Sequence, residues 1–158
     1  MRTLLLEELT WPEIKEALES GMKTVIIYSG AVEQHGPHLA ESTDTTRAYA
    51  EAVDLAERLG NALVAPVVRP GVSLPHMVLP GSISLRPEVF KGIVEDYIAS
   101  YVRHGFTHIV LASTHGGNMP TLMQVFSESR EKYPSVHFAM GYTMAEVGPV
   151  IVACEQAE

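Results

Sequence analysis

Cysteine is almost absent from this chain of 158 residues, which contains Cys154 alone. A lone thiol cannot form an internal disulfide, and it cannot build a zinc site from several thiolates. Any metal ion held by the chain must therefore be bound through nitrogen and oxygen atoms. Seven histidines are available for that purpose, so their positions become the main question.

Long hydrophobic runs and an excess of positive charge are also missing. The apolar runs, such as those at 24–28 and 108–112, are far shorter than the roughly 20 residues that cross a bilayer. The first nine residues lack the apolar stretch of a secretory signal, and we therefore expect a cytoplasmic protein without a membrane span. Eleven basic against nineteen acidic side chains give a formal charge of −8, which argues against nucleic acid and anionic membranes as partners.

The chain is long enough for one globular domain, since 46% of its 158 residues are hydrophobic. Short β-branched runs alternate with segments of helical period. We expect strands at 23–29, 62–68, 107–112 and 136–140, and helices at 10–21, 43–59, 87–103 and 119–132. This alternation predicts an α/β fold in which a parallel sheet is covered on both faces.

Polar clusters follow two of the expected strands, where ligands bind in open parallel sheets. Glu33 and His35 come after the first strand, and their spacing of two places both side chains on one side of an extended segment. Asp44 follows at a helix start, and His115 comes after the third strand. Two imidazoles and two carboxylates are ligand types that suit Zn²⁺, Mn²⁺ or Fe²⁺.

Simpler interpretations exist for each of these residues. Glu33 alone is typical of a solvated loop acid, and Asp44 is typical of a helix N-cap. His38 belongs either to the surroundings of the site or to the surface. We expect His104 to be structural at the end of its helix, and His108 and His137 to be packing residues of their strands.

Three motifs in register resemble the creatininase family, that is, creatinine amidohydrolase and its relatives. They are EQHGPHL at 33–39 with Thr43 and Asp44, PGSISL at 80–85, and THGGN at 114–118. The resemblance extends from about residue 10 to about residue 141. It implies a three-layer α/β/α sandwich with a mostly parallel sheet, a homo-oligomer that is usually a hexamer, and a site for two divalent metal ions.

The resemblance also implies roles for individual residues. Glu33 and His35 would each bind a different metal ion, Asp44 would bridge both, and His115 would bind the ion held by Glu33. Zn²⁺ is the expected metal, with Mn²⁺ or Fe²⁺ as alternatives. Ser73 and His76 match the segment that faces the substrate.

The reaction implied is hydrolysis of a non-peptide C–N bond in a small cyclic amide or formamide by a metal-bridging hydroxide. Backbone N–H groups near Gly116 and Gly117 would bind the substrate oxyanion. The leaving nitrogen needs a general acid, for which His76 is the nearest candidate. The substrate itself is not predicted.

Two departures from the family pattern bear on this expectation. Gly117 stands where creatininase proper has a carboxylate. We also expect residues 1–158 to form a single domain that lacks the family's C-terminal segment, with Glu155 or Glu158 as the candidates for its late ligand. The alternative function is a truncated or degenerate member that binds metal or assists assembly without catalysis. A nucleotide-binding flavodoxin-like module is disfavoured, because 116–117 lacks a phosphate fingerprint.

Overall fold

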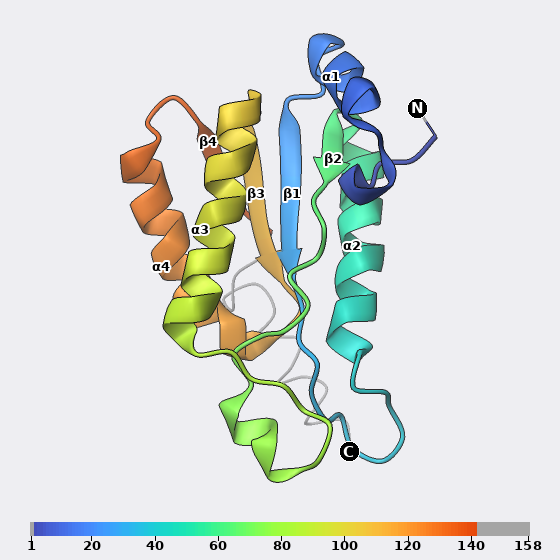
Figure 1. Ribbon diagram of the computed structural model, residues 1–158, viewed down its shortest axis with the longest axis vertical. Helices are drawn as coiled ribbons and strands as arrows, with labels where there is room; N and C mark the ends of the chain where they lie inside the picture. Colours follow the sequence, from blue (N-terminus) through green and yellow to red (C-terminus); the bar gives the residue numbers. More distant parts are fainter. Residues whose placement is uncertain (1, 142–158) are drawn as a thin grey trace, which may run out of the picture.

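The computed structural model describes residues 2–141 and contains a parallel sheet flanked by helices (Figure 1). The strands are β1 (Thr24–Ser29), β2 (Ala62–Val64), β3 (His108–Ser113) and β4 (His137–Met140). The helices are α1 (Trp11–Glu19), α2 (Thr43–Leu59), α3 (Pro87–His104) and α4 (Met119–Lys132), with short 3-10 helices η1 (Leu6–Glu8), η2 (Leu74–Val78) and η3 (Gly116–Asn118). Cys154, Glu155 and Glu158 lie outside the described residues.

The order of the strands decides where a site can form. All pairs are parallel and the order is β2-β1-β3-β4, so the chain leaves β1 toward one side and later crosses to the other. Ser29 at the end of β1 is paired with Ser113 at the end of β3. The carboxyl ends of these two central strands therefore meet at the point where the strand order reverses, the usual ligand position in such sheets.

Side chains alternate between the two faces of the sheet, and each face packs against different helices. Val25 and Ile27 of β1 belong to a core shared with α3 and α4, whereas Ile26 and Tyr28 pack against α2. The buried face of α2 consists of alanines, which allows that helix to lie close to the strands; they are Ala48, Ala52 and Ala56. The expected three-layer α/β/α arrangement is thus confirmed.

Local sequence signals account for the helix boundaries. The Thr10 backbone N–H donates to Glu13 Oε2 at 2.7 Å, the acidic half of a capping box that starts α1. Helices α2 and α3 end at Gly60 and Gly105, which have φ of 71° and 96°, as glycine favours at a helix end.

Three expectations need correction. Strand β2 ends at Val64, because Pro66 has no N–H and interrupts the ladder before contact resumes between Ser29 and Val68. His108 and His137 do not pack in the core, since both are exposed and their rings stack on each other at 4.8 Å. The helical period predicts one apolar face of α3 with Val89, Ile93, Tyr97 and Tyr101, whereas the fully buried residues are Phe90, Val94 and Ile98.

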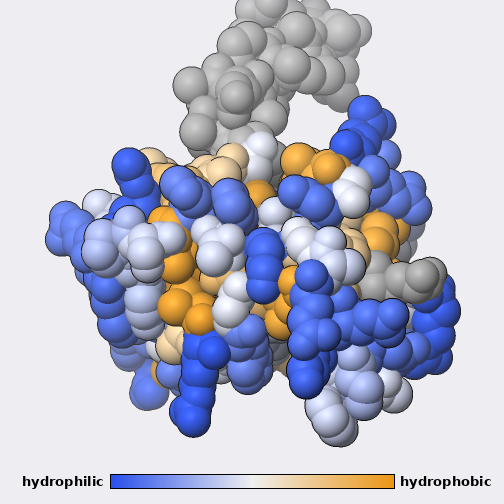
Figure 2. Space-filling model, turned by 90° about the horizontal axis from the view of Figure 1, so that it is seen from above, coloured by the Kyte–Doolittle hydropathy of each residue, from blue (hydrophilic) through white to orange (hydrophobic). Residues whose placement is uncertain are grey.

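The two ends of the molecule differ in character. Figure 2 views the end where the strands begin, which is covered largely by hydrophilic side chains with hydrophobic ones between them. The polar clusters of 33–44 and 115–118 lie at the opposite end, after β1 and β3. Within residues 2–141, no helix combines the length and the apolar character required to cross a membrane.

Neighbouring residues on α4 test the packing of this core. Leu122 is 1% exposed and Met123 is 60% exposed. We expect Leu122→Ala to lower the free energy of unfolding by about 2–5 kcal/mol, because it leaves a cavity. Met123→Ala should change it by less than about 0.5 kcal/mol. Urea denaturation of both variants measures the difference, and equal effects would contradict the packing described.

Candidate functional site

Four predicted ligand residues come together at the carboxyl edge of β1 and β3. Glu33 and His35 follow β1, Asp44 lies in the first turn of α2, and His115 follows β3. Glu33, Asp44 and His115 are buried, with exposed fractions of 4%, 3% and 7%. Both acids therefore lose most of their hydration, which favours a structure in which a cation compensates their charge.

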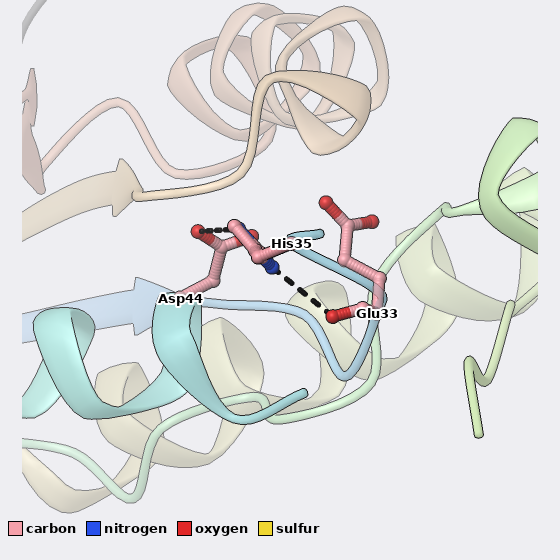
Figure 3. A group of neighbouring side chains, drawn as sticks. All are labelled: Glu33, His35 and Asp44. Carbon is pink, nitrogen blue, oxygen red and sulfur yellow. Dashed lines mark hydrogen bonds and ion pairs between the residues drawn. The ribbon is translucent and has the colours of Figure 1, made fainter. Parts of the chain in front are cut away.

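The polar atoms of these side chains are in mutual contact. His115 Nδ1 lies 3.0 Å from Glu33 Oε1 and 3.4 Å from Asp44 Oδ2. His35 Nε2 lies 3.3 Å from Asp44 Oδ1. Figure 3 shows the His35 ring between the Asp44 carboxylate and the backbone carbonyl of Glu33. Ligand atoms bound to one ion at about 2.0–2.2 Å are separated by similar distances.

Each of the two histidines donates one ring N–H to a backbone carbonyl and turns its other nitrogen toward a carboxylate. His35 Nδ1 lies 3.0 Å from the Glu33 carbonyl oxygen, and His115 Nε2 lies 2.9 Å from the Val72 carbonyl oxygen. A carbonyl only accepts, so these nitrogens carry the ring protons and the other nitrogens present lone pairs to Glu33 and Asp44. Lone pairs facing carboxylate oxygens require a proton or a metal ion between them. Metal-binding histidines have this arrangement, in which the distal N–H is bound to a carbonyl.

The remaining observations of the cluster also fit a divalent cation. Glu33 Oε2 is buried and has no hydrogen-bond partner in the part of the chain that the structure describes. One ligand atom from each of Glu33, His35 and Asp44 lies within 4.8 Å of the others. An unpartnered buried carboxylate oxygen beside two imidazoles is a donor set suited to zinc or manganese.

The electrostatics of His115 follow from the same contacts. Burial by itself lowers the pKa of His115. The hydrogen bonds to Asp44 and Val72, with the charges of Glu33 and Asp44, outweigh burial and raise this pKa above its ordinary value of 6.5. In the metal-free chain, a proton on His115 thus occupies the position that suits a cation.

Asn118 supports this geometry, although the sequence alone did not single it out. Its side chain is fully buried; Oδ1 accepts from the Val72 N–H at 2.8 Å, and Nδ2 donates to the Gly30 carbonyl at 2.9 Å. Asn118 thereby fixes the peptide whose carbonyl binds His115. Asn118 is the last residue of the THGGN motif. The sequence does not reveal its role, because its partner Val72 lies 46 residues away.

Two serines of the PGSISL motif join the surrounding loops. Ser82 Oγ accepts from the Gln34 N–H at 3.0 Å, and Ser84 Oγ accepts from the Ser73 N–H at 2.9 Å. Because the two serines are two residues apart, their side chains lie on the same side of an extended segment. The segment 82–84 therefore fixes both the loop after β1 and the loop before η2.

The other predicted site residues differ in position. His76, in η2, places Nε2 3.7 Å from Glu33 Oε1, at the border of the cluster. Ser73 is fully buried, and its Oγ lies 3.4 Å from His115 Nε2. Gly116 and Gly117 are exposed beside His115. His38 is exposed and is not part of the contacts described above.

The absence of a side chain at Gly117 leaves room beside Val72 and His115. A Cβ atom there would lie 2.3 Å from the Val72 carbonyl oxygen and 2.4 Å from His115 Nε2, whereas one at Gly116 would meet nothing within 4 Å. The missing side chain at 117 thus makes room for the hydrogen bond that orients His115.

Comparison with known proteins places this geometry in a family. The model of the creatininase family, described as creatinine amidohydrolase, matches residues 7–156. Creatinine amidohydrolase of Pseudomonas putida is 32% identical over 122 residues, which are 74% of this chain and 46% of that protein. Mycofactocin precursor peptide peptidase of Mycolicibacterium smegmatis is 36% identical over 110 residues, 66% of this chain and 44% of that protein. The chain spans about half the length of these relatives.

Solved structures agree in fold. A mutant creatininase of Zn-Zn type matches with a TM-score of 0.80 and 27% identity, over 89% of this chain and 58% of the other. A structure of creatininase with Mn matches with a TM-score of 0.79 and 27% identity, over 88% and 58%. The parallel sheet, the match over residues 7–156 and the relatives above lead to one conclusion: the chain belongs to the creatininase family.

Proposed function

We propose that the protein is a metal-dependent hydrolase of amide C–N bonds. The observation that carries the proposal is the pair of imidazole lone pairs, from His35 and His115, directed at the buried carboxylates of Asp44 and Glu33. The family supports hydrolysis as the reaction, since both creatinine amidohydrolase and the mycofactocin peptidase belong to it.

Different residues of the chain would bind the metal, orient its ligands and contact the substrate in such a site. Glu33, His35, Asp44 and His115 would hold the metal, and Val72 with Asn118 keeps His115 oriented. When bound, divalent cations polarise a carbonyl and lower the pKa of a coordinated water toward neutrality. The exposed backbone at Gly116 and Gly117 lies beside His115, where its N–H groups are available to a substrate oxygen.

The number and kind of metal ions belong to the proposal. A pair of ions bridged by Asp44, with zinc or manganese, is supported by the Zn-Zn and Mn forms of the similar creatininases. Asp44 is suited to bridging, because Oδ1 faces His35 while Oδ2 faces His115. Each oxygen therefore points toward a different imidazole.

The substrate class is proposed as a small amide, cyclic or formyl. One similar protein is a creatinine amidohydrolase and another is a peptide peptidase, so short peptides are the comparison class in an assay. Gly117 lacks the carboxylate expected of creatininase proper, and a Cβ there would collide with Val72 and His115. This favours an amide other than creatinine.

Assembly into a homo-oligomer is also proposed. Large exposed hydrophobic side chains gather at 74–83, beside the candidate site: Leu74, Met77, Val78, Leu79 and Ile83. Apolar groups concentrated in this way are typical of a covered surface. Sedimentation equilibrium tests the proposal, and a monomer at all concentrations would contradict it.

Substitution of the bridging acid tests the proposed function most directly. We expect Asp44→Asn to weaken Zn²⁺ or Mn²⁺ binding by about 100-fold or more, because it removes a charged ligand, and to abolish amide hydrolysis. Asp54→Asn is the matched control, since Asp54 lies on the same helix but is exposed and bonded to Arg58. Metal content and turnover of cyclic amides, formamides and short peptides are measured together.

The outcomes separate the alternatives. Metal-dependent turnover that Asp44→Asn removes and Asp54→Asn preserves supports the enzyme. Metal bound at Asp44 without turnover of any amide class would instead support the metal-binding or assembly subunit. Turnover equal in wild type and Asp44→Asn would exclude this site.

The raised pKa of His115 predicts how metal affinity depends on pH. The proton on His115 stabilises the metal-free fold fully below pH 6.5, and this contribution is lost as the pH rises through the raised pKa. A metal ion must displace that proton, so affinity should fall by up to about tenfold per pH unit below the raised pKa. Calorimetric Zn²⁺ titrations across this range measure the slope. A constant affinity would contradict the assignment of His115 as a ligand.

A further inference from the structure

His76 lies beside the ligand cluster but differs from the two proposed histidine ligands. Its ring centroid is 6.2 Å from that of His115, and its Nε2 is 3.7 Å from Glu33 Oε1. The latter distance exceeds that of a hydrogen bond, so within residues 2–141 Nε2 has no hydrogen-bond partner. The side chain is 33% exposed, which leaves this nitrogen accessible to a ligand.

Gln34 determines which nitrogen of His76 carries the proton. The backbone N–H of Gly36 donates to Gln34 Oε1 at 3.0 Å, which identifies the oxygen end of the amide. The other end, Nε2, lies 3.0 Å from His76 Nδ1. An amide NH₂ group only donates, so Nδ1 must accept and the proton of neutral His76 is on Nε2.

The same contact keeps Nδ1 of His76 as a hydrogen-bond acceptor. An N–H on Nδ1 would point at the Gln34 NH₂ group, and rotation of the amide would remove the acceptor of the Gly36 N–H. His76 thus presents an accessible Nε2–H group at the border of the cluster.

We propose that Gln34 is a positioning residue that fixes His76 as an Nε2–H donor, and that this N–H binds the carbonyl oxygen of the amide substrate. The substrate part of this inference rests on the proposed function. His76 keeps its proton throughout, so it stabilises negative charge on the oxygen and does not protonate the leaving nitrogen. The inference changes the role expected for His76 from the sequence.

The state of the ring is tested without any substrate. We expect ¹⁵N NMR of the metal-free chain, at a pH where histidine is neutral, to show the His76 proton on Nε2. Gln34→Glu places a carboxylate at Nδ1 and should move a proton to that nitrogen. Gln124→Glu is the control, because Gln124 is exposed on α4 and bonded to Glu128. A wild-type proton on Nδ1 would overturn the inference even if Gln34→Glu fails to fold.

The role of the N–H is tested by kinetics. His76→Ala should lower kcat by about 10²-fold to 10³-fold, as loss of an oxyanion donor does. His76→Gln keeps an amide N–H near the position of Nε2 and cannot transfer a proton, so it should recover most of that loss. Equal activity of the two variants would contradict the donor role. Absence of turnover in the wild type would contradict the proposed function, while the NMR result would still decide the state of His76.

Discussion

The arrangement of three imidazole rings around two buried carboxylates is the constraint on which the rest of the site depends. Backbone carbonyls bind the distal N–H groups of His35 and His115, so their other nitrogens face Asp44 and Glu33 as lone pairs. Such contacts are repulsive unless a cation lies among them. His76 has the opposite arrangement, because an amide NH₂ group binds its Nδ1 and the proton lies on Nε2, the nitrogen nearer to Glu33. The three rings thus have different chemistry within one cluster.

The fold provides the rigidity that this arrangement requires. Glu33 and His35 follow β1, His115 follows β3, and the pairing of Ser29 with Ser113 brings the two strand ends together. Hydrogen bonds from polar side chains then join the loops, where a sheet would use the regular backbone hydrogen bonds between strands. Asn118 holds the Val72 peptide, while Ser82 and Ser84 bind backbone N–H groups of the two loops that carry Gln34 and Ser73.

The positions of the four proposed ligand residues could be predicted from the sequence because these residues follow recognisable strand and helix signals. Periodicity predicted α2 and α4 with correct bounds, and the motifs located Glu33, His35, Asp44 and His115. The tautomers of the histidines could not be predicted, since they depend on partners such as Val72, which lies 43 residues from His115. The burial of Ser73 could not be predicted for the same reason, because its partners Ser84 and His115 lie 11 and 42 residues away.

The central claim is that Glu33, His35, Asp44 and His115 bind a divalent metal through these lone pairs. Anomalous X-ray diffraction from crystals of the chain grown with Mn²⁺ tests it most directly. The account predicts anomalous peaks at about 2.0–2.3 Å from carboxylate oxygens of Asp44, one of them also bound by Glu33 and by His115 Nδ1 and the other by His35 Nε2. An ion bound elsewhere, or a His115 ring turned to bind through Nε2, would contradict it.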